Sequence, residues 1–270
     1  SKERRREKPR RTLKIKQRKD KKHYPLIRRS NSFCIDIGPA KLIGHVEILN
    51  GAGGDSSAAD DCHQQKNENG QYQIFNIAYA QFAKFDFDYA HNIRCADRTR
   101  FVVHAALGVA VPYGNSTSLP FEKRYFAGGA NGVRGWAVRE LGPGVFGGTD
   151  RTIDYIRQSG DIKLGASLEF RNKLFWKLNG AVFVDAGNIW TIREYAEQPG
   201  GVFKFDEFYR QIAVAYGLGI RLDFNFLVVR LDGGMKAVNP AGATQGDRIP
   251  LTHPDMGRDF AFHLAVGYPF

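Results

Sequence analysis

The chain has 270 residues and a mass of 30.3 kDa, enough for one large domain or two small ones. Its twenty Phe, eleven Tyr and thirty Gly favour an all-β protein with tight turns and ring-bearing strands. The sequence has no run of about 18 apolar residues, which excludes a membrane-spanning helix. If this chain crosses a membrane, it does so as a β-barrel.

The net charge of +11 belongs to one end of the chain. Residues 1–30 hold fifteen Lys or Arg and three acids, whereas the other 240 residues hold 24 basic and 25 acidic ones. A basic tail is one way to bind nucleic acid, but Tyr24 is the only Phe, Tyr or Trp among these thirty residues, so stacking on bases has little support. We therefore expect residues 1–45 to be a poorly patterned tail, disordered or mis-assigned, and we expect no nucleic-acid partner.

The cysteines and metal-ligand side chains give no site. Cys34, Cys62 and Cys95 are widely spaced and odd in number, so no disulfide framework is expected. Residues 60–63, DDCH, carry metal-ligand side chains, but they lie in a polar loop without the second half of a site. We expect no metal and no cofactor.

The strand pattern becomes regular at Tyr72, where apolar and polar residues begin to alternate for some eighteen residues. A soluble strand averages about five or six residues, so the length of this predicted strand is informative. The same alternation recurs in six later segments. They are 101–111, 162–171, 178–187, 211–223, 226–236 and 259–270, and residues 42–49 form a weaker candidate.

The connections between the predicted strands alternate in length. Residues 172–177 and 224–225 are short, whereas 112–161, 188–210 and 237–258 are long. Short turns at one end, long loops at the other and strands with an apolar outer face are typical of an outer-membrane barrel. A soluble sandwich also alternates, but its strands are shorter.

A barrel in lipid must close, because lipid leaves no sheet edge satisfied. The seven or eight predicted strands could close a small barrel, but the connection 112–161 is long for so narrow a scaffold. We therefore predict an antiparallel transmembrane β-barrel, of which residues 46–270 are the C-terminal half. The whole barrel would have about sixteen strands, with the long loop folded into the lumen.

Residues 119–144, LPFEKRYFAGGANGVRGWAVRELGPG, show neither helical nor strand periodicity and lie between two predicted strands. Loops of this length are usually functional or disordered, and the four rings of this one argue against disorder. At its centre are Val133, Arg134, Gly135 and Trp136. An arginine between small and aromatic neighbours suits delivery to a fixed acidic partner.

Two acids are candidates for that partner. Glu169 and Asp185 fall on the polar, lumen-facing side of the two strands that follow the loop. If the loop folds back into the lumen, Arg134 can meet both carboxylates, one of them bidentately. Such a contact, which we call the loop pin, would be costly to break in a partly desolvated lumen. The alternative is that both acids are solvated lumen charges.

These residues resemble a known family. Residues 121–136, FEKRYFAGGANGVRGW, are similar to the long-loop motif of the BamA/TamA-like outer-membrane assembly factors, the bacterial surface antigen superfamily. The family's second signature, Gly-x-x-Phe-x-Asp-x-Gly, is matched by Gly180, Phe183, Asp185 and Gly187. The C-terminal targeting signal of outer-membrane barrels is resembled by Tyr268 and Phe270. The resemblance covers roughly residues 72–270.

The resemblance implies a function in the outer membrane of a Gram-negative cell. Family members fold and insert other β-barrel proteins, or move proteins across this membrane, without a nucleotide or metal. The implied partners are outer-membrane lipid, unfolded β-barrel clients, upstream POTRA domains and accessory subunits, although no POTRA domain is recognisable in these residues. An alternative within the same class is a secretion pore dedicated to one exported protein. A barrel enzyme is disfavoured, because no serine lies in a Gly-x-Ser-x-Gly elbow, and we expect no catalytic residue.

Overall fold

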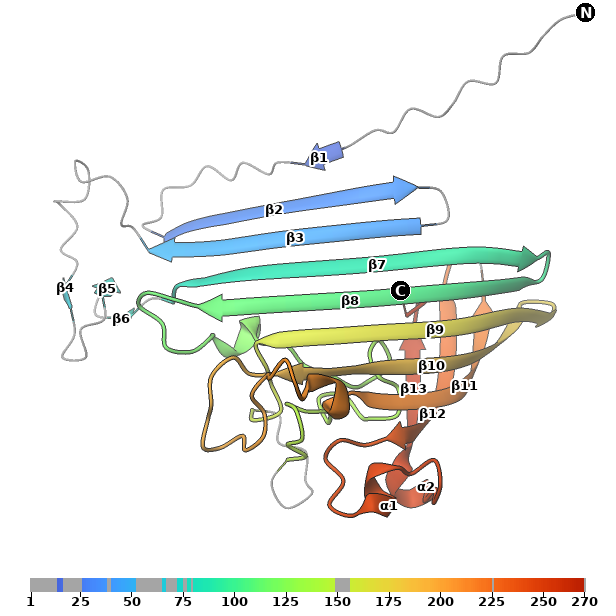
Figure 1. The fold of residues 1–270 in the computed structure, drawn as a ribbon. Coiled ribbons are helices and arrows are strands. Elements are labelled where there is room, and N and C mark those ends of the chain that lie inside the picture. The colour runs from blue at the N-terminus through green and yellow to red at the C-terminus, as the bar shows by residue number, and fades with distance from the viewer. Residues whose placement is uncertain are drawn as a thin grey trace, which may run out of the picture.

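The computed structural model describes residues 14–16, 26–37, 40–51, 65–66, 72–74, 77–78, 80–148, 156–224 and 226–269. Within them, one antiparallel sheet of ten strands is the main element (Figure 1). Its strands, in spatial order, are β1 (Lys14–Lys16), β2 (Leu26–Ile37), β3 (Ala40–Gly51), β7 (Phe82–Ala96), β8 (Thr99–Pro112), β9 (Ile162–Phe175), β10 (Leu178–Trp190), β11 (Ala213–Asp223), β12 (Val228–Val238) and β13 (Phe260–Val266).

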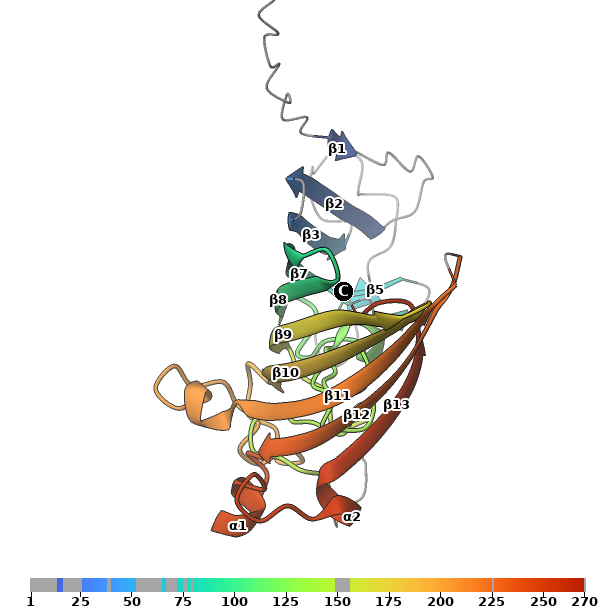
Figure 2. The ribbon, with the colours of Figure 1, turned by 90° about the vertical axis from the view of Figure 1, so that its right-hand side faces the viewer.

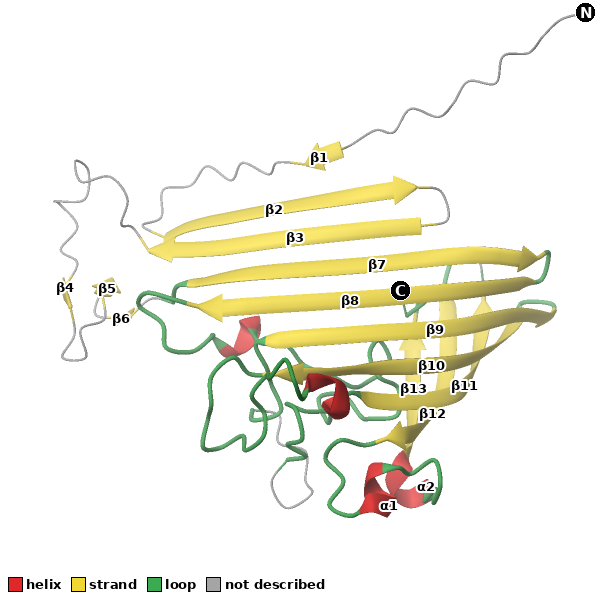
Figure 3. Cartoon of the chain, in the orientation of Figure 1, coloured by secondary structure: helices red, strands yellow, loops and turns green. Residues whose placement is uncertain are grey.

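The remaining elements are short. A three-stranded sheet is formed by β4 (Gln65–Lys66), β5 (Tyr72–Ile74) and β6 (Ile77–Ala78). The helices lie in the long connections (Figure 3). They are η1 (Phe121–Lys123), η2 (Phe208–Gln211), α1 (Gln245–Arg248) and α2 (Met256–Asp259). In the described ranges these helices lack the length and hydropathy that spanning a bilayer requires.

The large sheet is an up-and-down meander that curves around the connection between β8 and β9. Each strand of this sheet is paired with the strand of the same sheet that follows it along the chain, and every pairing is antiparallel. Short turns join β7 to β8 and β9 to β10 at one end, and long connections leave the other end (Figure 1). The described part of residues 113–148 lies on the concave side of the sheet (Figure 2). This all-β, antiparallel architecture is the predicted fold, that of part of a β-barrel.

The two faces of the sheet differ in chemistry, as predicted. On β10, the side chains of Val182 and Val184 are 52% and 45% exposed on the convex face. Phe183 and Asp185, which alternate with them, are each only 1% exposed. Period-two alternation thus places apolar side chains outward and polar ones toward the concave side, which is the distribution of a barrel in lipid.

The first long strand begins later than the sequence predicts. β7 starts at Phe82, and of the earlier alternating stretch Tyr72–Ile74 and Ile77–Ala78 belong to the small sheet. The backbone of Gln81 is bound by the chain that leaves β8: its carbonyl accepts from the Tyr113 amide at 3.1 Å, and its own amide donates to Ser116 Oγ at 2.8 Å. The Gln81 side chain also accepts from the Asn115 amide at 2.7 Å. These contacts fix the chain where the strand begins, which alternation alone does not reveal.

The last strand ends earlier than the predicted 259–270. β13 stops at Val266, and Gly267 follows with φ of +93°, a backbone conformation that favours glycine and turns the chain. Beyond the turn, Pro269 lines a cavity of about 180 Å³ on the concave side, between the β8–β9 loop and the sheet. Phe270, proposed as part of a targeting signal, lies outside the described residues.

β2 was not expected from the sequence, and β3 begins at Ala40, two residues before the candidate strand 42–49. β2 contains the consecutive polar residues 28–32, RRSNS, so the alternation that marks the later strands is missing there. Described parts of the expected tail 1–45 therefore lie in strands, while the domain boundary itself remains a prediction.

The packing around Gly217 leaves no room for a side chain. A Cβ there would lie 2.1 Å from the Gly233 carbonyl oxygen and 2.5 Å from the Phe183 ring. Gly217→Ala should lower the free energy of unfolding by about 1–3 kcal/mol through overpacking, measured by urea unfolding in detergent. Gly165→Ala is the matched control, because the added Cβ would meet only Ala106, at 3.8 Å. Equal stability of the two variants would contradict this packing.

Candidate functional site

The tip of the long loop has a fixed backbone shape. Gly128 and Gly129 have φ of +91° and +87°, which L side chains rarely adopt. The Gly129 amide donates to the Trp136 carbonyl at 2.9 Å, and the Gly132 amide donates back to Gly129 at 3.0 Å. Val133 and Trp136 are buried in the hydrophobic cluster under the loop. The glycine-rich segment therefore forms a tight turn that presents residue 134 to the sheet.

Arg134 is fully buried between two carboxylates of adjacent strands. Its Nε and Nη2 donate to the two oxygens of Asp185 at 2.7 and 2.8 Å, and its Nη1 donates to Glu169 Oε2 at 2.7 Å. The backbone amide of Arg134 also donates to Asp185, at 3.1 Å. The guanidinium stacks on the Phe183 ring, 3.5 Å from its centre. The structure thus brings the two acids named from sequence to the loop arginine.

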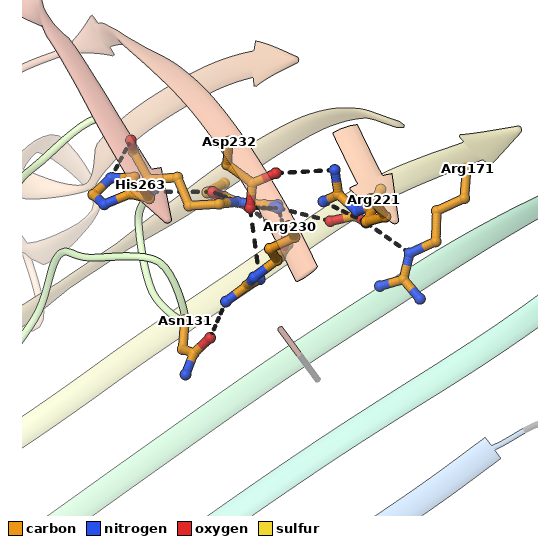
Figure 4. Close-up of polar contacts among 10 residues, drawn as sticks. Asn131, Arg171, Arg221, Arg230, Asp232 and His263 are labelled. Atoms are coloured by element: carbon orange, nitrogen blue, oxygen red, sulfur yellow. Dashed lines mark hydrogen bonds and ion pairs between the residues drawn. The ribbon is translucent and has the colours of Figure 1, made fainter. Parts of the chain in front are cut away.

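Further charges surround this contact and were not singled out from sequence (Figure 4). Arg171 and Arg221 both bind Glu169 Oε1, at 2.6 and 2.9 Å. Arg221 also binds Asp232, at 2.9 Å, and Arg230 lies 3.6 Å from the same acid. Together with the loop pin, this makes a continuous ionic network across β9, β10, β11 and β12. The sequence feature that could have identified them is the alternation along the strands, since all these residues fall on lumen-facing positions.

The loop tip also contacts the last two strands. His263 of β13 donates from Nε2 to the Arg134 carbonyl at 3.0 Å, and Arg230 of β12 donates to the side chain of Asn131. The backbones come so close that a Cβ at Gly234 would lie 2.1 Å from the Arg134 carbonyl oxygen. The tip is therefore bound to four strands of one wall.

The first half of the loop is anchored on the opposite part of the sheet. Tyr125 donates its hydroxyl to Asp86 of β7 at 2.6 Å, and its ring lies where a Cβ of Gly108 would be, 2.5 Å away. Burial and the hydrogen bond to Asp86 raise the pKa of Tyr125 above its ordinary value. Lys123 forms an ion pair with Glu47 of β3 at 2.8 Å. The loop thus runs as a strap from β3 and β7 to β12 and β13.

The other residues named from sequence have different surroundings. Gly187 is required by space, because a Cβ would lie 2.5 Å from the Leu164 carbonyl oxygen, whereas Gly180 would make only ordinary contacts from 3.4 Å. Gly135 is also tightly packed, because a Cβ added to it would lie 2.8 Å from the Cβ of Ala215. Tyr268 is 41% exposed, its hydroxyl donates to Asp223 at 3.4 Å, and its ring stacks on Arg171 at 4.6 Å.

The chemistry of the site suits holding the loop in place. Each acid of the network faces one or more guanidinium groups, and within the described ranges no group of three or more His, Cys, Asp or Glu is arranged to hold a metal ion. Removing one partner from a buried ion pair is strongly destabilising, because the remaining charge stays buried and unpaired.

Loss of the loop arginine should release the tip. We expect Arg134→Ala to destabilise the docked loop by about 3–5 kcal/mol, because Glu169 and Asp185 would remain buried without it. Limited chymotrypsin digestion checks this, since cleavage after Trp136 of the same loop, which is buried in the docked state, should become faster. Arg139→Ala serves as a control for charge, because that side chain stacks on Phe126 at 4.0 Å and lies outside the network. An unchanged digestion rate for Arg134→Ala would show that the loop does not depend on the pin.

Comparison with known proteins adds to these observations. The curated outer membrane protein assembly factor BamA of Neisseria meningitidis serogroup B is 31% identical over 98 residues, which are 33% of this chain and 11% of that protein. CdiB from Acinetobacter baumannii matches 88% of this chain and 33% of its own, with 16% identity and a TM-score of 0.47. BamA from Haemophilus ducreyi lacking POTRA domains 1–3 matches 88% of this chain and 53% of its own, with 14% identity and a TM-score of 0.49.

The chain spans only a part of the length of each of these relatives, between 11% and 53%. The family assignment comes from a different comparison. Residues 68–270, which include the strap, the ionic network and strands β7 to β13, match the Omp85 superfamily domain. The family expected from the loop motif and the strand signature is thereby confirmed, and the chain belongs to the Omp85 superfamily.

Proposed function

We propose that this protein is the barrel part of an outer-membrane factor that folds and inserts other β-barrel proteins. The observation that carries the proposal is the loop tip bound at once to β9, β10, β12 and β13 through Arg134. Family membership supports the coarser statement, protein assembly or transport in the outer membrane. No covalent bond is made or broken in such a process, so the proposal assigns no catalytic residue.

The geometry suits an activity that depends on the position of the last strand. In the described residues β13 pairs with β12 alone, and in a closed barrel its other edge would meet the first strand at the seam. Such an edge, when unpaired, is a template on which an extended segment of a client can add as a further strand. The His263 contact to the Arg134 carbonyl ties the edge strand to the loop. The loop pin would therefore hold the edge in the orientation that receives a client.

The partners of this proposal are unfolded β-barrel clients, outer-membrane lipid, upstream POTRA domains and accessory subunits. The alternative, a secretion pore dedicated to one exported protein, uses the same loop and strands. It differs in requiring a passage through the lumen, which the strap crosses.

The proposal is tested by reconstitution. The complete protein in liposomes should accelerate the folding of an unfolded β-barrel client, followed by its heat-modifiable migration on gels. Arg134→Ala should slow client folding about tenfold or more, while Arg139→Ala should leave the rate unchanged. Wild-type activity of Arg134→Ala would remove the loop pin from the mechanism. Absence of any client folding, together with export of a single partner protein, would favour the secretion pore.

The link between loop and edge strand has its own test. His263→Leu keeps the volume of the side chain but leaves the buried Arg134 carbonyl without this donor, at a cost of about 1–3 kcal/mol. Hydrogen exchange of the β13 amides should become faster, and that of β9 should not. His253→Leu, in the exposed connection before β13, is the control. If β13 exchanges at the wild-type rate in His263→Leu, the coupling of loop and edge is absent.

A further inference from the structure

A second cluster of charges lies on the concave side at the opposite end of the strands, where the short turns join them. It lines a cavity of about 230 Å³, which we call the turn-end cavity. Two of its lining residues are acidic and five are cationic. The cations are Arg98, Arg100, Arg171, Lys173 and Lys177. This surplus of positive charge is local, because residues 31–270 as a whole are almost neutral.

Strand register brings two of these cations face to face. Arg100 of β8 lies directly opposite Arg171 of β9. Like charges directly opposite each other on neighbouring strands are destabilising. A second pair of facing arginines, Arg221 and Arg230, shows how the repulsion can be relieved. Asp232 lies 2.9 Å from Arg221 and 3.6 Å from Arg230.

Of the two facing arginines, Arg171 has an acid beside it, Glu169 at 2.6 Å, whereas Arg100 has none in the described residues. Over the part of the chain that the structure describes, the side chains of Arg98, Arg100 and Lys173 make no hydrogen bond or ion pair. Of the two acids in the lining, Asp97 binds Arg94, at 2.8 Å, and Asp223 accepts from Tyr268. The charges of Arg98, Arg100 and Lys173 therefore have no acid paired with them in the described residues.

One of the cations is held in place. Arg171 donates from Nε to Glu169 at 2.6 Å, and its guanidinium stacks on the Tyr268 ring at 4.6 Å. A fixed arginine loses little conformational freedom when it binds an anion. The cavity thus combines one oriented arginine with several cations around it.

We propose that the turn-end cavity binds an acidic segment of a polypeptide, whose carboxylates take the place that Asp232 takes between Arg221 and Arg230. Carboxylates pair bidentately with arginine, and a cleft of one sign attracts such a segment. The cavity faces the concave side of the sheet, whereas lipid meets the convex side with Leu168 and Phe170. This orientation favours a polypeptide over lipid headgroups. The inference is independent of the client-folding proposal.

The test measures binding of fluorescein-labelled hexaglutamate to the full chain in detergent by fluorescence anisotropy. The double variant Arg100→Ala with Lys173→Ala should weaken binding about tenfold or more, since each charged hydrogen bond contributes substantially. The matched control, Lys204→Ala with Arg210→Ala, removes the same charge in the long connection between β10 and β11 and should bind within about twofold of the wild type. Arg100→Lys, which keeps the charge, should retain most of the affinity and shows that the fold is intact.

Several outcomes would overturn the inference. Equal losses in the cavity and control variants would mean unspecific attraction, and no loss in either would mean that the peptide binds elsewhere. Displacement of the peptide by millimolar inorganic phosphate, but not by sodium chloride of equal ionic strength, would assign the cavity to phosphate. Binding of phosphatidylglycerol vesicles that is lost in the cavity variant, with peptide binding retained, would assign it to lipid.

Discussion

The structure depends on the burial of one guanidinium group. Moving the charge of Arg134 out of water is unfavourable unless partners replace the water on every side. Asp185, Glu169 and Ser167 do so at 2.7 to 3.3 Å, and they come from two strands that must be in register to receive it. The loop therefore docks completely or not at all. Partial docking would leave either the arginine or its acids buried and unpaired.

Glycine makes this docking possible at both ends of the strap. Gly108 leaves room for the Tyr125 ring, and Gly234 lets the backbone of the loop tip approach that of β12. Side chains at these positions would hold the loop away from the sheet, where its charges could not reach their partners. Small residues in the wall and charged residues in the loop are two halves of one recognition surface.

Much of the fold and part of the site follow from the sequence. Alternation identifies strands that face lipid on one side and lumen on the other, because each side chain must suit one of two solvents. It fails for β2, whose run of polar residues hides the period, and at the end of β13, where Gly267 redirects the chain. Arg134, Glu169 and Asp185 could be named because a motif and parity select them. The Arg221–Asp232 pair could not, since its partners are set by the register of β11 and β12, which a sequence does not display.

Because the last strand is short, the two ends of the sheet should differ in resistance to unfolding under force. The ladder between β12 and β13 holds seven residue pairs, whereas that between β7 and β8 holds fourteen. A ladder with half as many pairs opens locally at a lower free energy. Under a pulling force applied along the chain from its C-terminal end, the sheet would unzip one strand at a time from β13. The first barrier in such an experiment would report the contact of a single histidine with the loop as much as the ladder itself.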